Sequence, residues 1–365
     1  MSKRIVLCTD GTWDKISNHT NVYRFYNGVR QSAEQVAFYD DGVGADGTPV
    51  AKVAGGAFGL GLFQKIKQGY TQIAHVYEAG DPLFLFGFSR GAYTARSIAG
   101  MIAICGLPTK NFDDHLVDLA FEAYRNKDQR PALLAQLNQT YAIDDAKITM
   151  LGVWDTVGSL GIPATVGAVD PLVYGFLDTT LHVDVRNAYH AVAIDEMRCE
   201  FPATLWTSTP AVGQVMEQVW FCGCHGDVGG GVSADATTGS ALSDITLAWM
   251  MNKACALGLD IDSDLQKTYS IPLDPKYALD NMHPTWNVLW GFPKHRDIAR
   301  SSSIADSVVV RSQHQESWRP KNLQFANGIP DPSYQVVSVL KSPAPEMDGN
   351  GRRPVAITEA AMSAR

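Results

Sequence analysis

Short apolar runs recur along the chain, and segments with apolar residues at helical spacing follow most of them. The runs have the length and the β-branched and aromatic content of buried strands. Strands that alternate with helices predict βαβ units, and hence an α/β fold with a mostly parallel central sheet and helices on both faces. The predicted strands are residues 4–11, 35–42, 82–87, 147–155 and 215–223, and the predicted helices are 21–32, 63–80, 90–106, 113–140 and 241–258.

Two regions interrupt this alternation. Residues 156–215 are apolar but broken by Gly and Pro, which fits either a cap inserted over a ligand crevice or an ordinary crossover with an extra helix. Residues 259–365 have little periodicity and are rich in Pro, Trp and Arg, so they predict a loop-rich extension that wraps the core. We expect a single domain over residues 1–365, with its core at 1–155 and 216–258.

Polar residues follow four of the predicted strands at the point where each strand ends. These loops are TDGT at 9–12, FSRG at 88–91, WDTVG at 154–158 and CHGDVGGG at 224–231. In open α/β sheets, ligands bind in the crevice beyond the carboxyl ends of the strands. The sequence therefore predicts that the four loops converge on one site.

The second loop contains the spacing Gly-x-Ser-x-Gly, from Gly87 through Ser89 to Gly91. A buried strand precedes it and a helix follows, which is the context of a strained turn that exposes a nucleophilic serine. The two glycines would make room for that turn because they carry no Cβ. The alternative is that Ser89 merely caps the helix, and the local context favours the nucleophile.

A serine nucleophile needs a base and an orienting carboxylate, and the other loops offer both. Asp155 and His225 each follow a strand, and the order Ser89, Asp155, His225 is one in which such triads occur. Asp227 competes with Asp155 as the carboxylate, but a position so close to His225 suits loop shaping better. Three other histidines lie in predicted helical or connecting segments and are expected to be structural or exposed: His115, His182 and His190.

The oxyanion that forms when Ser89 attacks a carbonyl needs two N–H donors. The backbone N–H of Arg90, at the start of the helix, is one candidate. The second should come from an early strand-to-loop junction, where Gly11 or Thr12 is well placed. A simple Asp-Gly turn explains this junction almost equally well.

Composition excludes several classes of protein. The formal net charge is -8 and no Lys/Arg block occurs, so nucleic acid is a poor partner. No run approaches the length of a transmembrane helix, and the N-terminus lacks the apolar stretch of a signal peptide. We expect a cytoplasmic protein, or one exported without such a signal. Cys222 and Cys224 adjoin His225, but no second ligand pair accompanies them, so no metal is expected. The glycine-rich stretches lack the spacing of a phosphate loop or a dinucleotide site, so no organic cofactor is expected either.

Several motifs together resemble the catalytic domain of type VI secretion lipase effectors of the first Tle family. They are VLCTDGTW, GFSRGAYTAR, GVWDTVGSLG, VWFCGCHGDVGGG, LSDITLAWM and SWRPKNL, in this order between about residues 4 and 324. The resemblance implies an α/β-hydrolase fold and a phospholipase that releases fatty acyl chains. It assigns Ser89 as nucleophile, Asp155 as acid and His225 as base. It also implies a secretion-system or immunity partner.

The sequence therefore predicts a serine ester hydrolase of the lipase or phospholipase type. A non-lipid carboxylesterase or a polyester hydrolase with the same triad remains an alternative. So does a reading from another class, an inactive α/β scaffold that binds a partner through its Trp-rich C-terminal region. Reactivity of Ser89 toward a fluorophosphonate distinguishes the enzyme from the scaffold.

Overall fold

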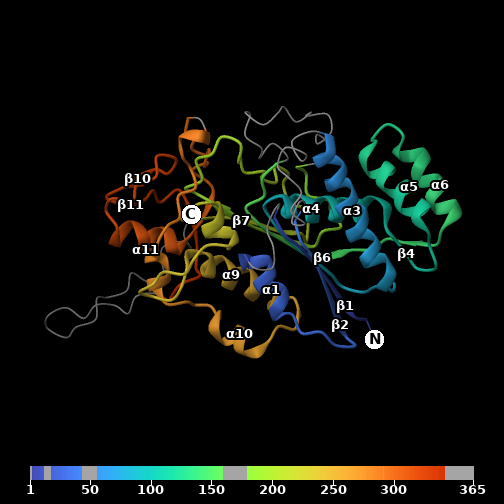
Figure 1. Cartoon of the computed structure of the whole chain (residues 1–365), viewed down its shortest axis with the longest axis horizontal. Coiled ribbons are helices and arrows are strands. Elements are labelled where there is room, and N and C mark those ends of the chain that lie inside the picture. Colours follow the sequence, from blue (N-terminus) through green and yellow to red (C-terminus); the bar gives the residue numbers. More distant parts are fainter. Residues whose placement is uncertain (1, 12–17, 43–55, 159–178, 291, 342–365) are drawn as a thin grey trace, which may run out of the picture.

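A computed structural model describes residues 2–11, 18–42, 56–158, 179–290 and 292–341. Its centre is an eight-stranded sheet with the order β12-β9-β8-β7-β6-β3-β1-β2 (Figure 1). All described pairings within this sheet are parallel, which confirms the predicted α/β fold. The strands are β1 (Arg4–Thr9), β2 (Gln35–Asp40), β3 (Leu83–Phe88), β6 (Ile148–Trp154), β7 (Asn187–Ala193), β8 (Val215–Phe221), β9 (Ser303–Ala305) and β12 (Gln335–Val337).

Helices cover both faces of this sheet (Figure 1). The α-helices are α1 (Asn21–Gly28), α3 (Gly56–Val76), α4 (Ser89–Cys105), α5 (Asp114–Arg125), α6 (Arg130–Thr140), α8 (His225–Gly229), α9 (Leu242–Ala256), α10 (Ser263–Thr268) and α11 (Asp306–His314). In the part of the chain that the structure describes, the 3-10 helices are η2 (Pro275–Leu279) and η3 (Val288–Trp290), and short antiparallel pairs join β4 (Leu107–Pro108) to β5 (Ile143–Asp144) and β10 (Phe325–Ala326) to β11 (Ile329–Pro330).

The side chains of β1 alternate between two hydrophobic cores. Ile5 and Leu7 pack into the core that α3, α4 and α5 form on one face of the sheet. Val6 and Cys8 pack into the core on the other face, which contains α1 and α9. Because side chains alternate along a strand, a strand buried on both faces reads as an unbroken apolar run.

Residues 156–215, for which we expected a cap or a crossover, lie partly in the central sheet. β7 (Asn187–Ala193) lies within this range, and it pairs with β6 on one side and β8 on the other. The second half of the range thus belongs to the core of the sheet. Residues 159–178 lie outside the described part of the chain, so a cap there stays a prediction.

The C-terminal region is likewise more than an outer wrapping. β9 and β12 extend the central sheet beyond β8, and α11 packs on the core that contains α9. Short strands and irregular connections hide this contribution from a periodicity argument, because three residues give too little pattern to recognise. The predicted core of 1–155 and 216–258 was therefore too small.

No described helix is both long and apolar enough to span a lipid bilayer.

Candidate active site

Ser89 lies at the sharp junction between β3 and α4. Its φ is +57°, in the left-handed region that residues with a side chain rarely adopt. A Cβ atom on Gly87 would lie 2.6 Å from the carbonyl oxygen of Gly91, and one on Gly91 would lie 2.2 Å from the carbonyl oxygen of Thr9. The turn that presents Ser89 therefore has no room for a side chain on either glycine.

Ser89, His225 and Asp155 form one hydrogen-bonded chain, although they are far apart in the sequence. Nε2 of His225 lies 2.8 Å from Oγ of Ser89, and Nδ1 lies 2.5 Å from Oδ2 of Asp155. With Nδ1–H donating to the carboxylate, Nε2 accepts the hydrogen bond from the serine hydroxyl. This arrangement lets the imidazole remove the hydroxyl proton as the oxygen attacks.

Asp155 follows β6 directly and is fully buried. Its Oδ1 accepts hydrogen bonds from the backbone N–H of Ala193 at 2.9 Å and from Nη1 of Arg296 at 2.6 Å. Burial alone would raise the pKa of Asp155, but the positive charge of Arg296 and the hydrogen bond from His225 hold it well below its usual range. The carboxylate is therefore ionised and oriented toward His225.

His225 is the first residue of α8, and two aromatic rings pack against its imidazole. The ring centroid of Phe88 lies 4.6 Å away and that of Phe201 lies 5.2 Å away. Burial lowers the pKa of His225, and the hydrogen bond that the imidazole donates to the Asp155 carboxylate partly opposes this shift. The imidazole consequently stays neutral at neutral pH, as a general base must.

Asp227, the rival carboxylate, makes different contacts. Its Oδ2 accepts a hydrogen bond from the backbone N–H of Cys224 at 2.8 Å and so caps α8. His283 donates to the same carboxylate through its backbone N–H, and its Nδ1 lies 2.7 Å from Oδ1. Asp227 thus shapes the loop that carries His225, while Asp155 contacts the imidazole itself.

The candidate oxyanion donors are only partly described. The N–H of Gly11 donates to Oδ1 of Asp10 at 2.8 Å, so this donor is already engaged. Thr12 lies outside the described residues. The N–H of Arg90 belongs to the first turn of α4, next to Ser89, where helix amides point out of the N-terminus.

Sequence reasoning missed three charged residues around the triad. Arg296 is bonded to Asp155, and the Arg198 side chain is bonded to Glu196 by two hydrogen bonds of 2.8 Å each. Glu196 also accepts a long hydrogen bond of 3.4 Å from the backbone N–H of His225. Had β7 been predicted, Glu196 and Arg198 would have been recognised as residues of the loop that follows a strand. Nothing in the sequence pattern around Arg296 indicates a functional residue.

The structure also corrects the predicted setting of one histidine. His190 lies in β7 rather than in a helix or connection, and burial together with the nearby Arg96 lowers its pKa to about 3. Its Nε2 accepts a hydrogen bond of 3.1 Å from the backbone N–H of Thr156, which is a structural role. His115 is exposed on α5, and His182 lies 3.3 Å from Asp184.

One hollow of about 180 Å³ adjoins the triad. Phe201, which packs on His225, and Arg296, which binds Asp155, both line it. Its lining combines apolar side chains with polar ones that are mainly basic; the full lining is Arg198, Cys199, Phe201, Pro202, Ala203, Leu205, Trp220, Lys294, His295, Arg296 and Asp297.

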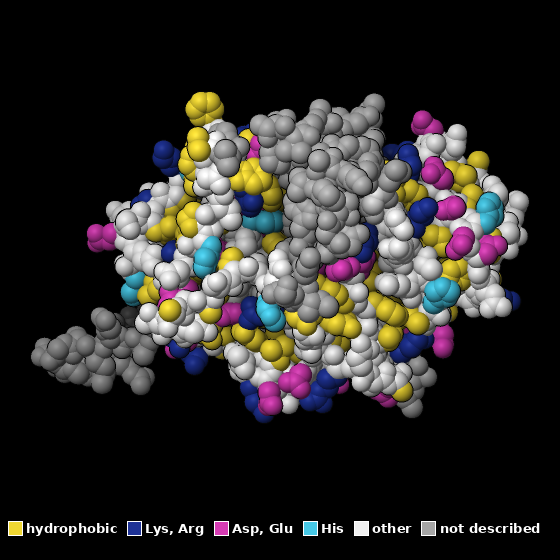
Figure 2. All heavy atoms as spheres, in the orientation of Figure 1, with side chains coloured by type: hydrophobic (Ala, Val, Ile, Leu, Met, Phe, Trp, Pro, Cys, Tyr) yellow, Lys and Arg dark blue, Asp and Glu magenta, His cyan; other side chains and the backbone are white. Residues whose placement is uncertain are grey.

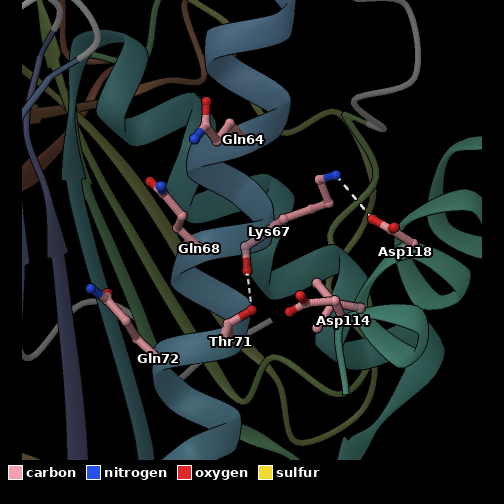
Figure 3. A pocket seen from close by; sticks show the side chains of 8 residues that line it. Gln64, Lys67, Gln68, Thr71, Gln72, Asp114 and Asp118 are labelled. Carbon is pink, nitrogen blue, oxygen red and sulfur yellow. Dashed lines mark hydrogen bonds and ion pairs between the residues drawn. The ribbon is translucent and has the colours of Figure 1, made fainter. Parts of the chain in front are cut away.

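A larger hollow of about 640 Å³ lies between α3 and α5 (Figure 3). Most of its lining is polar, and Nζ of Lys67 bridges the two helices by a 3.0 Å contact to Asp118. No triad residue lines it.

Acidic and basic side chains are interspersed over the face in Figure 2, without a broad basic surface there.

Comparison with known proteins places this chain beside a family model, a yeast relative and solved structures. The family "T6SS, Phospholipase effector Tle1-like, catalytic domain" matches residues 3–253. An uncharacterized protein of Saccharomyces cerevisiae is 30% identical over 237 residues, covering 58% of this chain and 33% of its own. An uncharacterized Pseudomonas aeruginosa structure has 16% identity and a TM-score of 0.47, covering 74% of this chain and 49% of its own. The Tle1 effector bound to the VgrG spike has 17% identity and a TM-score of 0.38, covering 65% and 52%.

This chain spans about a third of the length of the yeast relative and about half of each solved structure. The family match covers more than half of the chain and includes the segments that carry Ser89, Asp155 and His225. The chain belongs to the family of catalytic domains described as Tle1-like phospholipase effectors of type VI secretion.

Proposed function

We propose that this protein is a serine hydrolase that cleaves carboxylic esters of lipids, with Ser89 as nucleophile, His225 as base and Asp155 as the orienting acid. The observation that carries the proposal is the continuous hydrogen-bonded chain from Ser89 Oγ through His225 to Asp155. Capping alone would require Ser89 to bond a helix amide, whereas its hydroxyl is directed at an imidazole.

In the first step, Oγ of Ser89 attacks the ester carbonyl carbon as Nε2 of His225 takes the hydroxyl proton. The tetrahedral oxyanion then collapses, the alcohol leaves with that proton, and an acyl-serine remains. Water attacks the acyl-serine, its proton passes through His225, and the acid departs as Ser89 regains its hydrogen. The Arg90 N–H is the proposed first oxyanion donor, and the Gly11 or Thr12 N–H the second. The N–H of Gly11 would have to break its hydrogen bond to Oδ1 of Asp10 before it could donate to the oxyanion.

Two features support a lipid as substrate. The family description names phospholipase effectors. In addition, Val288, the first residue of η3, is 81% exposed, and Phe292, which follows η3, is 93% exposed. This segment is tied to the site, because the ring of Trp290 stacks edge-on against Phe201 at 5.7 Å, and Phe201 packs on His225. Exposed apolar side chains next to a catalytic site suit contact with a lipid aggregate.

The test compares the wild type with Ser89→Ala on phospholipid vesicles, triglyceride emulsions and soluble p-nitrophenyl esters. We expect Ser89→Ala to abolish turnover and fluorophosphonate labelling, since the members of a triad act as a unit. Ser97→Ala is the matched control, because Ser97 is a fully buried serine of the same helix. It should keep both activities.

The alternatives have distinct outcomes. Turnover of soluble esters without any turnover of lipids would favour a non-lipid carboxylesterase or a polyester hydrolase. A wild-type protein that neither labels at Ser89 nor hydrolyses any ester would be the inactive binding scaffold.

Export by a type VI secretion system follows from the same family membership and is likewise a proposal. It predicts that the protein co-purifies with a spike or immunity protein encoded in its own genome. The solved Tle1 effector is itself bound to a VgrG spike.

A further inference from the structure

Arg296 lies between η3 and β9, beyond the residues that the family match covers, and it is only 7% exposed. Its guanidinium holds both carboxylate oxygens of Asp155, with Nη1 2.6 Å from Oδ1 and Nη2 3.0 Å from Oδ2. A guanidinium that binds both oxygens fixes the carboxylate plane as well as its position.

The remaining donors of Arg296 hold the guanidinium in place. Nη1 donates to the carbonyl oxygen of Ala193 at 2.9 Å, at the end of β7. Nη2 and Nε donate to the carbonyl oxygen of Phe201 at 2.8 and 3.2 Å. Arg296 thus joins the C-terminal region to the strand end and the loop that surround the triad.

We propose that Arg296 is a positioning residue of the triad, which holds Asp155 in the orientation that directs Oδ2 at Nδ1 of His225. This role rests on the serine hydrolase function proposed above. The matched family region therefore relies on an arginine that the C-terminal region supplies.

Arg296 also changes the electrostatic environment of the pair that His225 forms with Asp155. Among the described residues, the charged and titratable groups that face His225 and Asp155 are Arg296, Glu196, Arg198 and His190, with Glu196 paired to Arg198 and His190 buried in β7. The positive charge of Arg296 partly cancels the negative charge of the Asp155 carboxylate. Without it, the pair of His225 and Asp155 would bind a proton more tightly.

The experiment measures kcat and KM for a soluble p-nitrophenyl ester across pH, in the full chain, for the wild type and two variants. Arg296→Met removes the charge and both contacts to Asp155. We expect kcat to fall about 100-fold because the base is misoriented, with KM little changed. We also expect the acidic limb of the kcat/KM profile to move to higher pH.

Arg296→Lys keeps the positive charge but loses the planar fork. Its acidic limb should stay near that of the wild type while kcat falls by less than in Arg296→Met. A lowered kcat together with a wild-type acidic limb would separate the effect of orientation from the effect of charge. A residue that only stabilised the fold would not give this result.

Arg311→Met is the matched control. Arg311 is another buried arginine of the C-terminal region, and its Nη1 donates to the carbonyl oxygens of Ala278 and Asp280 at 2.8 and 2.9 Å. This variant should lose thermal stability while its acidic limb and kcat stay at the wild-type values.

Unchanged kcat and an unchanged acidic limb in both Arg296 variants, with an active wild type that labels at Ser89, would overturn the role of Arg296 alone. An inactive wild type would instead overturn the hydrolase function. If Arg296→Met does not fold, Arg296→Lys decides: a lowered kcat at unchanged KM supports the role, and wild-type kcat rejects it.

Discussion

Ser89 is held in a backbone conformation that its own residue type disfavours, and the surrounding backbone enforces it. Asp155 shares this feature, with φ values of +57° for Ser89 and +38° for Asp155. Both residues stand at strand ends, and around Ser89 the close packing of neighbouring backbone leaves no room for another turn. Strain of this kind, observed directly at two residues of one hydrogen-bonded chain, is typical of a functional site.

The close packing at Gly91 gives a prediction at the residue scale. Gly91→Ala would place a Cβ 2.2 Å from the carbonyl oxygen of Thr9 and 2.4 Å from that of Asp10. Backbone atoms cannot move aside as a flexible side chain can, so we expect a loss of about 1–3 kcal/mol or more in the free energy of unfolding. Urea denaturation measures it.

Gly158→Ala is the matched control, because its nearest neighbour, Oγ1 of Thr204, would lie at an ordinary 3.6 Å. A Gly91→Ala protein as stable and as active as Gly158→Ala would contradict the steric account of the turn.

At the scale of elements, the sequence predicted most of the framework that carries the site. β1, β2, β3, β6 and β8 were recognisable because each is an apolar run bounded by turn residues. β7 was missed although it lies in the middle of the sheet. Its sequence, NAYHAVA, is rich in Ala, which is uncommon in strands, and only Tyr189 and Val192 have high strand propensity, so the segment gave a weak strand pattern.

The Asp227 cap holds the start of α8, where His225 lies. Asp227→Ala removes the cap of the helix that begins with His225, and also the contacts to His283. Because hydrogen bonds to a charged group are lost, we expect stability to fall by about 1.5–3 kcal/mol. Turnover should fall as well, since the imidazole loses its fixed position.

Asp262→Ala tests whether that loss of turnover is specific. Asp262 caps α10 by accepting from the N–H groups of Asp264 and Leu265 at 3.0 and 3.2 Å. This exposed cap should cost about 1 kcal/mol and leave kcat unchanged. Equal kcat in both variants would show that the Asp227 cap does not orient His225.

At the scale of the whole molecule, the exposed side chains of Val288 and Phe292, in and after η3, are the proposed contact with a lipid surface. We predict that Phe292→Ser weakens binding to phospholipid vesicles by about tenfold or more, because a Phe side chain buried in lipid contributes about 1.5–3 kcal/mol. Hydrolysis of a soluble ester should not change. Vesicle sedimentation and a p-nitrophenyl assay measure the two effects.

Val212→Ser is the matched control for this surface effect. Val212 is also fully exposed, but it precedes β8, whose opposite end leads to His225. Equal loss of vesicle binding in both variants would indicate general apolar contact with lipid rather than a surface oriented by the active site.

The amino-acid sequence alone predicts the α/β class, the strand-to-helix turn at Ser89, and the strand ends that carry Asp155 and His225. These are local signals, since an apolar run, a turn residue and a spacing can each be read within about ten positions. That β7, β9 and β12 complete the sheet, and that Arg296 binds Asp155, became visible only in the folded chain. Those features depend on contacts between distant segments, and an arginine in an irregular segment leaves no periodic trace of the carboxylate that it binds.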